Sequence, residues 1–122
     1  MKILSPALHS ALDYLVVVIL WTAPFILNLN GLIATLTYSL GAVHLLLTVF
    51  TNFPLGIIKI VPLKIHGYIE LIVSVVLLTT PLYISKLSAM DSAMDTFFFG
   101  GFGVIVFITW LISDYDPCGD AV

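Results

Sequence analysis

The sequence contains no arginine, and its four lysines leave a formal net charge of −3. Nucleic-acid binding needs clustered basic side chains that neutralise phosphates, so this scarcity argues against a nucleic-acid partner. Only 9% of the 122 residues are charged, whereas 61% are hydrophobic. A soluble domain carries roughly 25% charged residues, so we expect most of this surface to contact the lipid bilayer rather than water.

Recognisable catalytic motifs are missing as well. The sequence has no glycine-rich phosphate loop, no nucleophile elbow and no cysteine-based redox motif. Its single cysteine, Cys118, lies in a polar tail without a Cys/His cluster around it, and we assign it no role. An enzyme is therefore the third-ranked class of function for this chain.

Four apolar runs are long enough to cross a bilayer, which takes about 20 residues at about 1.5 Å per residue. They predict helices over residues 8–29, 32–51, 65–84 and 96–113. No small-residue cleavage pattern follows the first run, so we interpret it as a retained helix and not as a signal peptide. The predicted fold class is all-α: a polytopic membrane protein with four transmembrane helices in a single transmembrane domain, residues 1–122.

The segments between the helices set the predicted orientation. The loop over residues 52–64 contains an apolar stretch, Leu55 to Val61, which we expect to lie flat in the membrane interface. The lysines are divided between the two sides of the membrane, with Lys2, Lys59 and Lys64 on one side and Lys86 on the other. The positive-inside rule then places both termini, including the polar tail 114–122, in the cytoplasm.

The two halves of the chain resemble each other at an offset of 57 residues. At this offset, polar residues and prolines coincide as the pairs His9 and His66, Asp13 and Glu70, Thr22 and Thr79, and Pro24 and Pro81. The second helices match less clearly, with Gly41 opposite Gly100 or Gly101. Because two helices return the chain to its starting side, we predict two parallel repeats, about 8–51 and 65–113, related by a pseudo-two-fold axis along the membrane normal.

The chain resembles the SPW-repeat family of small bacterial membrane proteins over nearly its whole length. The strongest stretch is TNFPLGIIKIVPLKIHGYIEL, from Thr51 to Leu71, beside the N-terminal HSALDYL, which is similar to the family's His-x-x-x-Asp-Tyr-Leu. The family's Ser-Pro-Trp appears here as Ala-Pro-Phe at 23–25 and Thr-Pro-Leu at 80–82, and Glu70 replaces an aspartate. The resemblance implies a protein of the bacterial inner (plasma) membrane with no assigned activity.

Polar side chains within the predicted spans form the candidate site. A histidine precedes an acid by four residues in both the first and the third helix, so each pair shares one helix face. A third histidine lies at a similar depth on the second helix, within a stripe of small and polar residues: Thr37, Gly41, His44, Thr48 and Thr51. We expect five residues to converge in the inner-leaflet half of the bundle, namely His9, Asp13, His44, His66 and Glu70.

Four interpretations of this cluster stay open, and the structural one ranks first: the His–acid pairs satisfy one another and His44 hydrogen-bonds across helices. A metal site ranks next, level with a proton or small-ion relay, because His and carboxylate ligands suit Zn, Fe or Mn. The Glu-x-x-His spacing of di-metal bundles is absent. Haem, which needs axial ligands that face each other, ranks last.

The leading prediction of function is a non-enzymatic membrane scaffold or interaction module without a cofactor, acting as a homo-oligomer or as the partner of another membrane protein. The alternative is a small ion, proton or metal-binding or transport protein that uses the polar cluster. Transport would favour a homodimer, because four helices alone make a poor alternating-access device.

Overall fold

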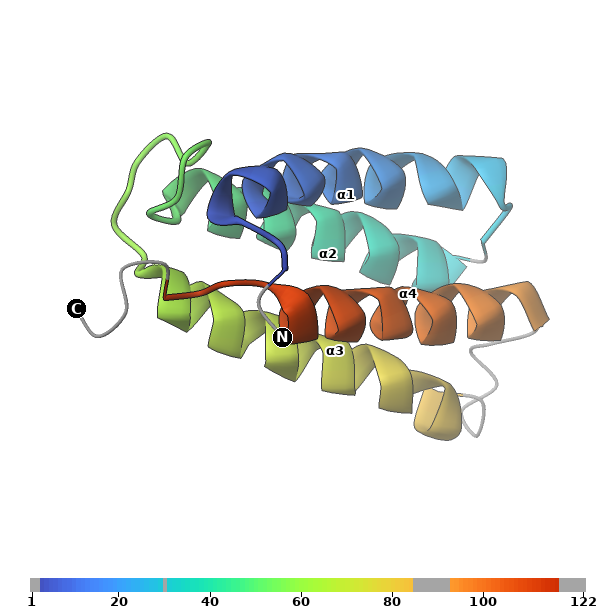
Figure 1. Cartoon of the computed structure of the whole chain (residues 1–122). Coiled ribbons are helices and arrows are strands. Elements are labelled where there is room, and N and C mark those ends of the chain that lie inside the picture. The colour runs from blue at the N-terminus through green and yellow to red at the C-terminus, as the bar shows by residue number, and fades with distance from the viewer. Residues whose placement is uncertain (1–2, 30, 85–92, 117–122) are drawn as a thin grey trace.

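A computed structural model describes residues 3–29, 31–84 and 93–116 and is all-helical (Figure 1). Its helices are α1 (Pro6–Ile26), α2 (Gly31–Phe50), α3 (Leu63–Ile84) and α4 (Ala93–Ile112). All four are long and apolar enough to cross a membrane, as in a multi-pass membrane protein, which confirms the predicted class. The predicted bounds differ by no more than a few residues, the largest shifts being the end of α1 and the start of α4.

The helices form two layers, with α1 packed on α2 and α3 packed on α4 (Figure 1). Within each layer the helices run in opposite directions, and α1 and α3 begin at the same end of the molecule (Figure 1). Two of the four lysines used for the orientation prediction, Lys2 and Lys86, lie outside the described residues, as does Cys118 in the polar tail. The orientation in the membrane therefore stays a prediction.

Local chemistry explains where α1 begins and ends. Ser5 caps its start, because the Ser5 Oγ accepts a hydrogen bond from the Leu8 N–H at 3.3 Å, and Pro6 occupies the first turn, where no N–H is needed. After the helix, Asn28 adopts a left-handed backbone with φ of 51°, which asparagine tolerates better than most residues. The chain thus reverses tightly into α2. Pro24 lies inside the last turn and does not itself terminate the helix.

The interior differs between the two ends of the bundle. At the end where α2 and α4 begin, an apolar core draws on all four helices and the first turn: Leu20, Leu29, Ile33, Leu77, Phe99 and Phe102. At the other end the buried side chains are mainly polar, and they make up the candidate site. Many large apolar side chains are exposed around the outside of the helices, as expected for contact with lipid.

Two short backbone pairings close the polar end. Leu4, ahead of α1, forms a parallel bridge with Ser113 at the end of α4. Val61, ahead of α3, forms the same kind of bridge with Thr51 at the end of α2. Leu4 lies five residues before His9, and Val61 lies five residues before His66. Each bridge therefore holds a hydroxyl residue at the end of α4 or α2 beside a histidine of the other helix pair.

The glycine pairing expected from the repeat needs a correction. A Cβ on Gly41 would lie 2.6 Å from the Trp21 ring and 3.2 Å from Leu20, so this glycine permits close contact between α1 and α2. The equivalent contacts of α4 with α3 are made by Gly103, whose added Cβ would lie 3.0 Å from Leu77 and Leu78. Gly100 and Gly101, the expected matches, have no atom within 4 Å of an added Cβ.

Candidate functional site

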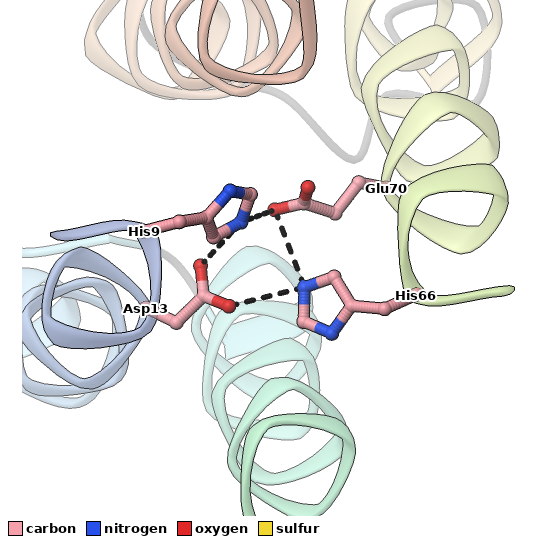
Figure 2. Close-up of side chains that lie close together, drawn as sticks. All are labelled: His9, Asp13, His66 and Glu70. Carbon is pink, nitrogen blue, oxygen red and sulfur yellow. Dashed lines mark hydrogen bonds and ion pairs between the residues drawn. The ribbon is translucent and has the colours of Figure 1, made fainter. Parts of the chain in front are cut away.

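The site lies between the two helix layers, where α1 and α3 face each other (Figure 2). α1 contributes His9 and Asp13, and α3 contributes His66 and Glu70, each pair one helical turn apart on one face. All four residues are at most 4% exposed. Four ionisable side chains, drawn from both helix pairs, are thus held in one water-poor pocket.

Each histidine is shared by both acids. The contacts expected within a helix are present: His9 Nε2 lies 3.3 Å from Asp13 Oδ1, and His66 Nε2 lies 3.7 Å from Glu70 Oε1. The contacts between helices are shorter, at 3.2 Å from His9 Nε2 to Glu70 Oε1 and 3.0 Å from His66 Nε2 to Asp13 Oδ2. The four side chains therefore form a closed ring in which histidines and carboxylates alternate, and not two separate pairs.

His44, the fifth predicted residue, joins the ring from α2. Its Nε2 lies 3.4 Å from Asp13 Oδ1, but no hydrogen bond to this nitrogen occurs among the described residues. The His44 side chain is 14% exposed, more than any other member of the cluster. The structure thus brings together all five sequence-predicted residues, with His44 at the margin.

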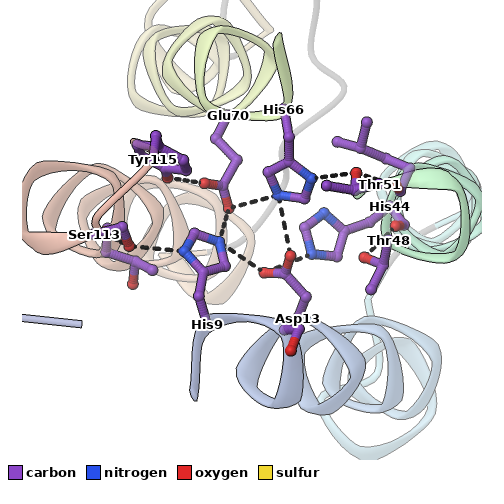
Figure 3. A network of polar contacts seen from close by, with 12 residues as sticks. His9, Asp13, His44, Thr48, Thr51, His66, Glu70, Ser113 and Tyr115 are labelled. Carbon is purple, nitrogen blue, oxygen red and sulfur yellow. Dashed lines mark hydrogen bonds and ion pairs between the residues drawn. The ribbon is translucent and has the colours of Figure 1, made fainter. Parts of the chain in front are cut away.

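Hydroxyl groups at the ends of α2 and α4 fix the two ring histidines (Figure 3). His9 Nδ1 lies 2.8 Å from Ser113 Oγ, and His66 Nδ1 lies 2.7 Å from Thr51 Oγ1. Both hydroxyls donate their only proton to a backbone carbonyl of their own helix, those of Thr109 and Leu47 respectively. Each hydroxyl is therefore left to accept from the imidazole, which places a proton on Nδ1 and directs Nε2 at the carboxylates.

Tyr115 completes the surroundings of Glu70. The Tyr115 hydroxyl donates a hydrogen bond to Glu70 Oε2, and the Tyr115 ring meets the His9 ring edge-on at 5.4 Å between centroids. Burial, together with the nearby Glu70 carboxylate, raises the pKa of Tyr115 well above its ordinary value, so the phenol stays protonated and remains a donor. One Glu70 oxygen is thus held from outside, and the other faces the histidines.

Three of these residues, Thr51, Ser113 and Tyr115, have roles that the sequence patterns did not predict. Thr51 appears in those patterns only in a packing stripe, Ser113 only as the end of a span and Tyr115 only in the polar tail. A signal was available, because Thr51-x-Phe53 and Ser113-x-Tyr115 both place an aromatic residue two positions after a hydroxyl at a helix end. Phe53 packs against the His66 ring, at 5.2 Å between centroids, much as Tyr115 packs against His9.

The chemistry of the ring follows from the outer hydrogen bonds. With a proton on Nδ1, a neutral imidazole presents the lone pair of Nε2 to the carboxylate oxygens, and two lone pairs at this distance repel. The ring therefore needs either added protons, on the imidazoles or on the carboxyl groups, or a metal ion between these atoms. Haem fits poorly, since the His9 and His66 rings already meet edge-on at 5.4 Å between centroids.

The donor set and its spacing suit a metal ion. One ligand atom from each of His9, Asp13, His66 and Glu70 can be chosen so that all four lie within 4.8 Å of one another. A tetrahedral zinc with bonds of about 2.0–2.2 Å has ligand-to-ligand distances of about 3.3–3.6 Å. The contacts of Glu70 Oε1 with the two histidine Nε2 atoms, at 3.2 and 3.7 Å, and those of the two Asp13 oxygens with them, at 3.3 and 3.0 Å, are close to that range. Outer hydrogen bonds to the second imidazole nitrogen are typical of metal-binding histidines.

Comparison with known proteins identifies no family model, no curated protein and no solved structure that matches this chain. The resemblance to the SPW-repeat family consequently stays a prediction that depends on the sequence motifs given above.

Proposed function

We propose that this chain is a membrane-embedded metal-binding protein whose ring of His9, Asp13, His66 and Glu70 holds one divalent transition metal ion. The observation that carries the proposal is the shortest contact in the ring. His66 Nε2 and Asp13 Oδ2 lie 3.0 Å apart, yet neither atom makes a hydrogen bond with any described residue. A proton on nitrogen must point at its acceptor, whereas a metal ion beside the N–O line binds both atoms.

Charge supports the same conclusion. Two buried carboxylates carry a charge of about −2, which is costly in a low-dielectric interior unless it is compensated. One divalent ion with two neutral imidazoles compensates it completely. Imidazole and carboxylate ligands without thiolate favour Zn²⁺, Fe²⁺ or Mn²⁺ over softer ions. The four ligands come from α1 and α3, so the ion would also link the two helix layers.

The structural interpretation remains the second candidate, because one observation favours it. His9 Nε2 lies in hydrogen-bonding geometry toward Glu70 Oε1 at 3.2 Å, as a doubly protonated imidazole would. In that case the ring is two imidazoliums between two carboxylates, and the protein is a scaffold or interaction module held together by a buried ionic network. Metal analysis separates the two candidates.

The proposal also includes the internal symmetry of the fold and its orientation in the membrane. A pseudo-two-fold axis along the membrane normal is supported by the matched bridges at Leu4 and Val61 and by the matched contacts of Gly41 and Gly103. Placement in a bacterial inner membrane, with both termini in the cytoplasm, is supported by the family resemblance and the lysine distribution. Labelling of Cys118 from the cytoplasmic side only, and of a Ser88→Cys variant from the outside only, would test that orientation.

The test of metal binding uses protein purified from membranes through a tag without histidine. Elemental analysis after supply of Zn²⁺, Fe²⁺ or Mn²⁺ should find about one ion per chain. His66→Ala and Glu70→Gln should lose the ion, while Ser74→Ala should keep it. Ser74 is a matched control, because it is buried on α3 one turn beyond Glu70, and its hydroxyl donates to the Leu71 carbonyl and makes no other hydrogen bond among the described residues. If the wild-type protein contains no metal under any of the three conditions, the ring is a buried ionic network that stabilises the fold.

A further inference from the structure

A narrow crevice lies beside the site and is lined by α2, α3 and α4. Its volume is about 30 Å³. Most of its lining is aliphatic and comes from three helices: Leu40, Val43 and Leu47 of α2, Ile69 and Val73 of α3, and Val106 of α4. The two polar members of the lining are His44 and Glu70. The crevice thus connects two members of the polar cluster to the lipid-facing surface, where Val43 is 57% exposed.

The dimensions and lining restrict what the crevice can admit. A water molecule needs roughly 10–15 Å³ measured in this way, so the space holds one or two small molecules. Aliphatic walls make the entry of an ion costly, because an ion would lose its hydration without compensation. What fits is a neutral molecule of one or two non-hydrogen atoms, such as water or a diatomic gas.

The polar end of the crevice offers a partner for such a molecule. The His44 side chain lines the crevice and, at 14%, is the most exposed of the cluster, although its Nε2 atom is itself buried. The counterpart of His44 in the other helix pair is Val106, if Gly41 is matched with Gly103 as their contacts indicate. Glu70 therefore has an aliphatic neighbour and free space on the side where Asp13 has a histidine.

We infer that the metal centre is an open one: a small neutral ligand reaches it through this crevice and hydrogen-bonds to His44. The inference rests on the proposed function, since it requires the ion to be present. Four protein ligands fill the tetrahedral shell of Zn²⁺, so the small molecule would bind as a fifth ligand to an ion with a larger coordination shell, such as Fe²⁺ or Mn²⁺. The crevice provides space for such a ligand beside Glu70, and His44 provides a group to orient it.

Nitric oxide and the Fe²⁺-loaded protein in detergent provide a direct test. Nitric oxide is neutral and diatomic, and its complex with Fe²⁺ has a distinct electron paramagnetic resonance signal. The wild-type protein should give this signal. Val106→Phe, which fills the crevice, should keep its iron and lose the signal, and Val43→Phe at the exposed rim should do the same with less risk to folding. Ile105→Phe is the control, because Ile105 is 58% exposed on the same helix and does not line the crevice.

The outcomes separate this inference from the proposed function. Iron without a nitrosyl signal in the wild type would show a closed centre and overturn the inference while leaving metal binding intact. An undiminished signal in both filled variants would overturn the crevice as the route. Protein that takes up no iron, zinc or manganese would overturn the proposed function, and the inference with it.

Discussion

The two helix pairs hold their histidines in the same way, but their acids have different neighbours. In each pair a histidine bonds a hydroxyl at the end of the other pair, His9 with Ser113 and His66 with Thr51. Asp13, however, has its third polar contact from His44, whereas Glu70 has its third from Tyr115. What the pairs share holds the histidines in place, and what differs makes the two carboxylates chemically unequal. The cluster is thus symmetric in how its histidines are held and asymmetric in the neighbours of its two acids.

The largest expected effect comes from breaking the ring on one side only. Glu70→Leu should lower the free energy of unfolding by about 3–5 kcal/mol, because it leaves Asp13 as the one buried carboxylate beside both His9 and His66. His66→Leu combined with Glu70→Leu should be milder than the sum of the two single changes, since His9 and Asp13 can still pair within α1. Thermal unfolding in detergent without added metal measures both. A double variant as unstable as that sum would contradict the shared ring.

The next largest effect concerns Tyr115, which donates a hydrogen bond to Glu70 and not to Asp13. Tyr115→Phe removes the outer donor to Glu70 and should cost about 1–3 kcal/mol through an unsatisfied buried oxygen. Because the pKa of Tyr115 is raised, the folded state holds the phenol proton more tightly than the unfolded chain does. The contribution of Tyr115 to the free energy of unfolding is therefore constant below the ordinary tyrosine pKa of about 10 and falls as the pH rises above it.

The measurement for Tyr115→Phe is therefore stability as a function of pH. The difference between wild type and variant should be flat from neutral pH to about pH 9 and should shrink above about pH 10. Tyr68→Phe is the matched control, because Tyr68 is 61% exposed on α3. A difference that grows with rising alkalinity would show that Tyr115 does not donate to Glu70.

A smaller pair of changes tests whether the two helix pairs are packed alike. Gly41→Ala and Gly103→Ala should each cost about 1–3 kcal/mol, because an added Cβ would overlap the facing helix. Gly41→Ala should cost more, since its Cβ would lie 2.6 Å from Trp21, against 3.0 Å from Leu77 for Gly103. Gly100→Ala meets no atom within 4 Å and should be neutral. Equal losses at Gly100 and Gly103 would contradict the corrected alignment of the second helices.

The sequence predicts the contacts within one helix but not the contacts between helices. Apolar runs and four-residue spacing act within one helix, so the four helices and the two His–acid pairs follow from composition and periodicity. The cross-helix sharing of His66 by Asp13 does not, because it depends on how α1 and α3 face each other. Tyr115 lies beyond the last helix, where no periodic pattern indicates that the chain folds back over Glu70.

The smallest expected effect concerns His44, the residue that most clearly distinguishes the two pairs. His44 Nε2 makes no hydrogen bond among the described residues, and Asp13 keeps His9 and His66 as partners without it. His44→Leu should therefore change the free energy of unfolding by less than about 1 kcal/mol and should leave the metal content unchanged. In the Fe²⁺-loaded protein the same change should weaken the nitrosyl complex, because the small ligand loses its hydrogen-bond donor. Loss of metal from His44→Leu would instead make His44 a ligand of the ion, and the centre would then be built on five residues and not four.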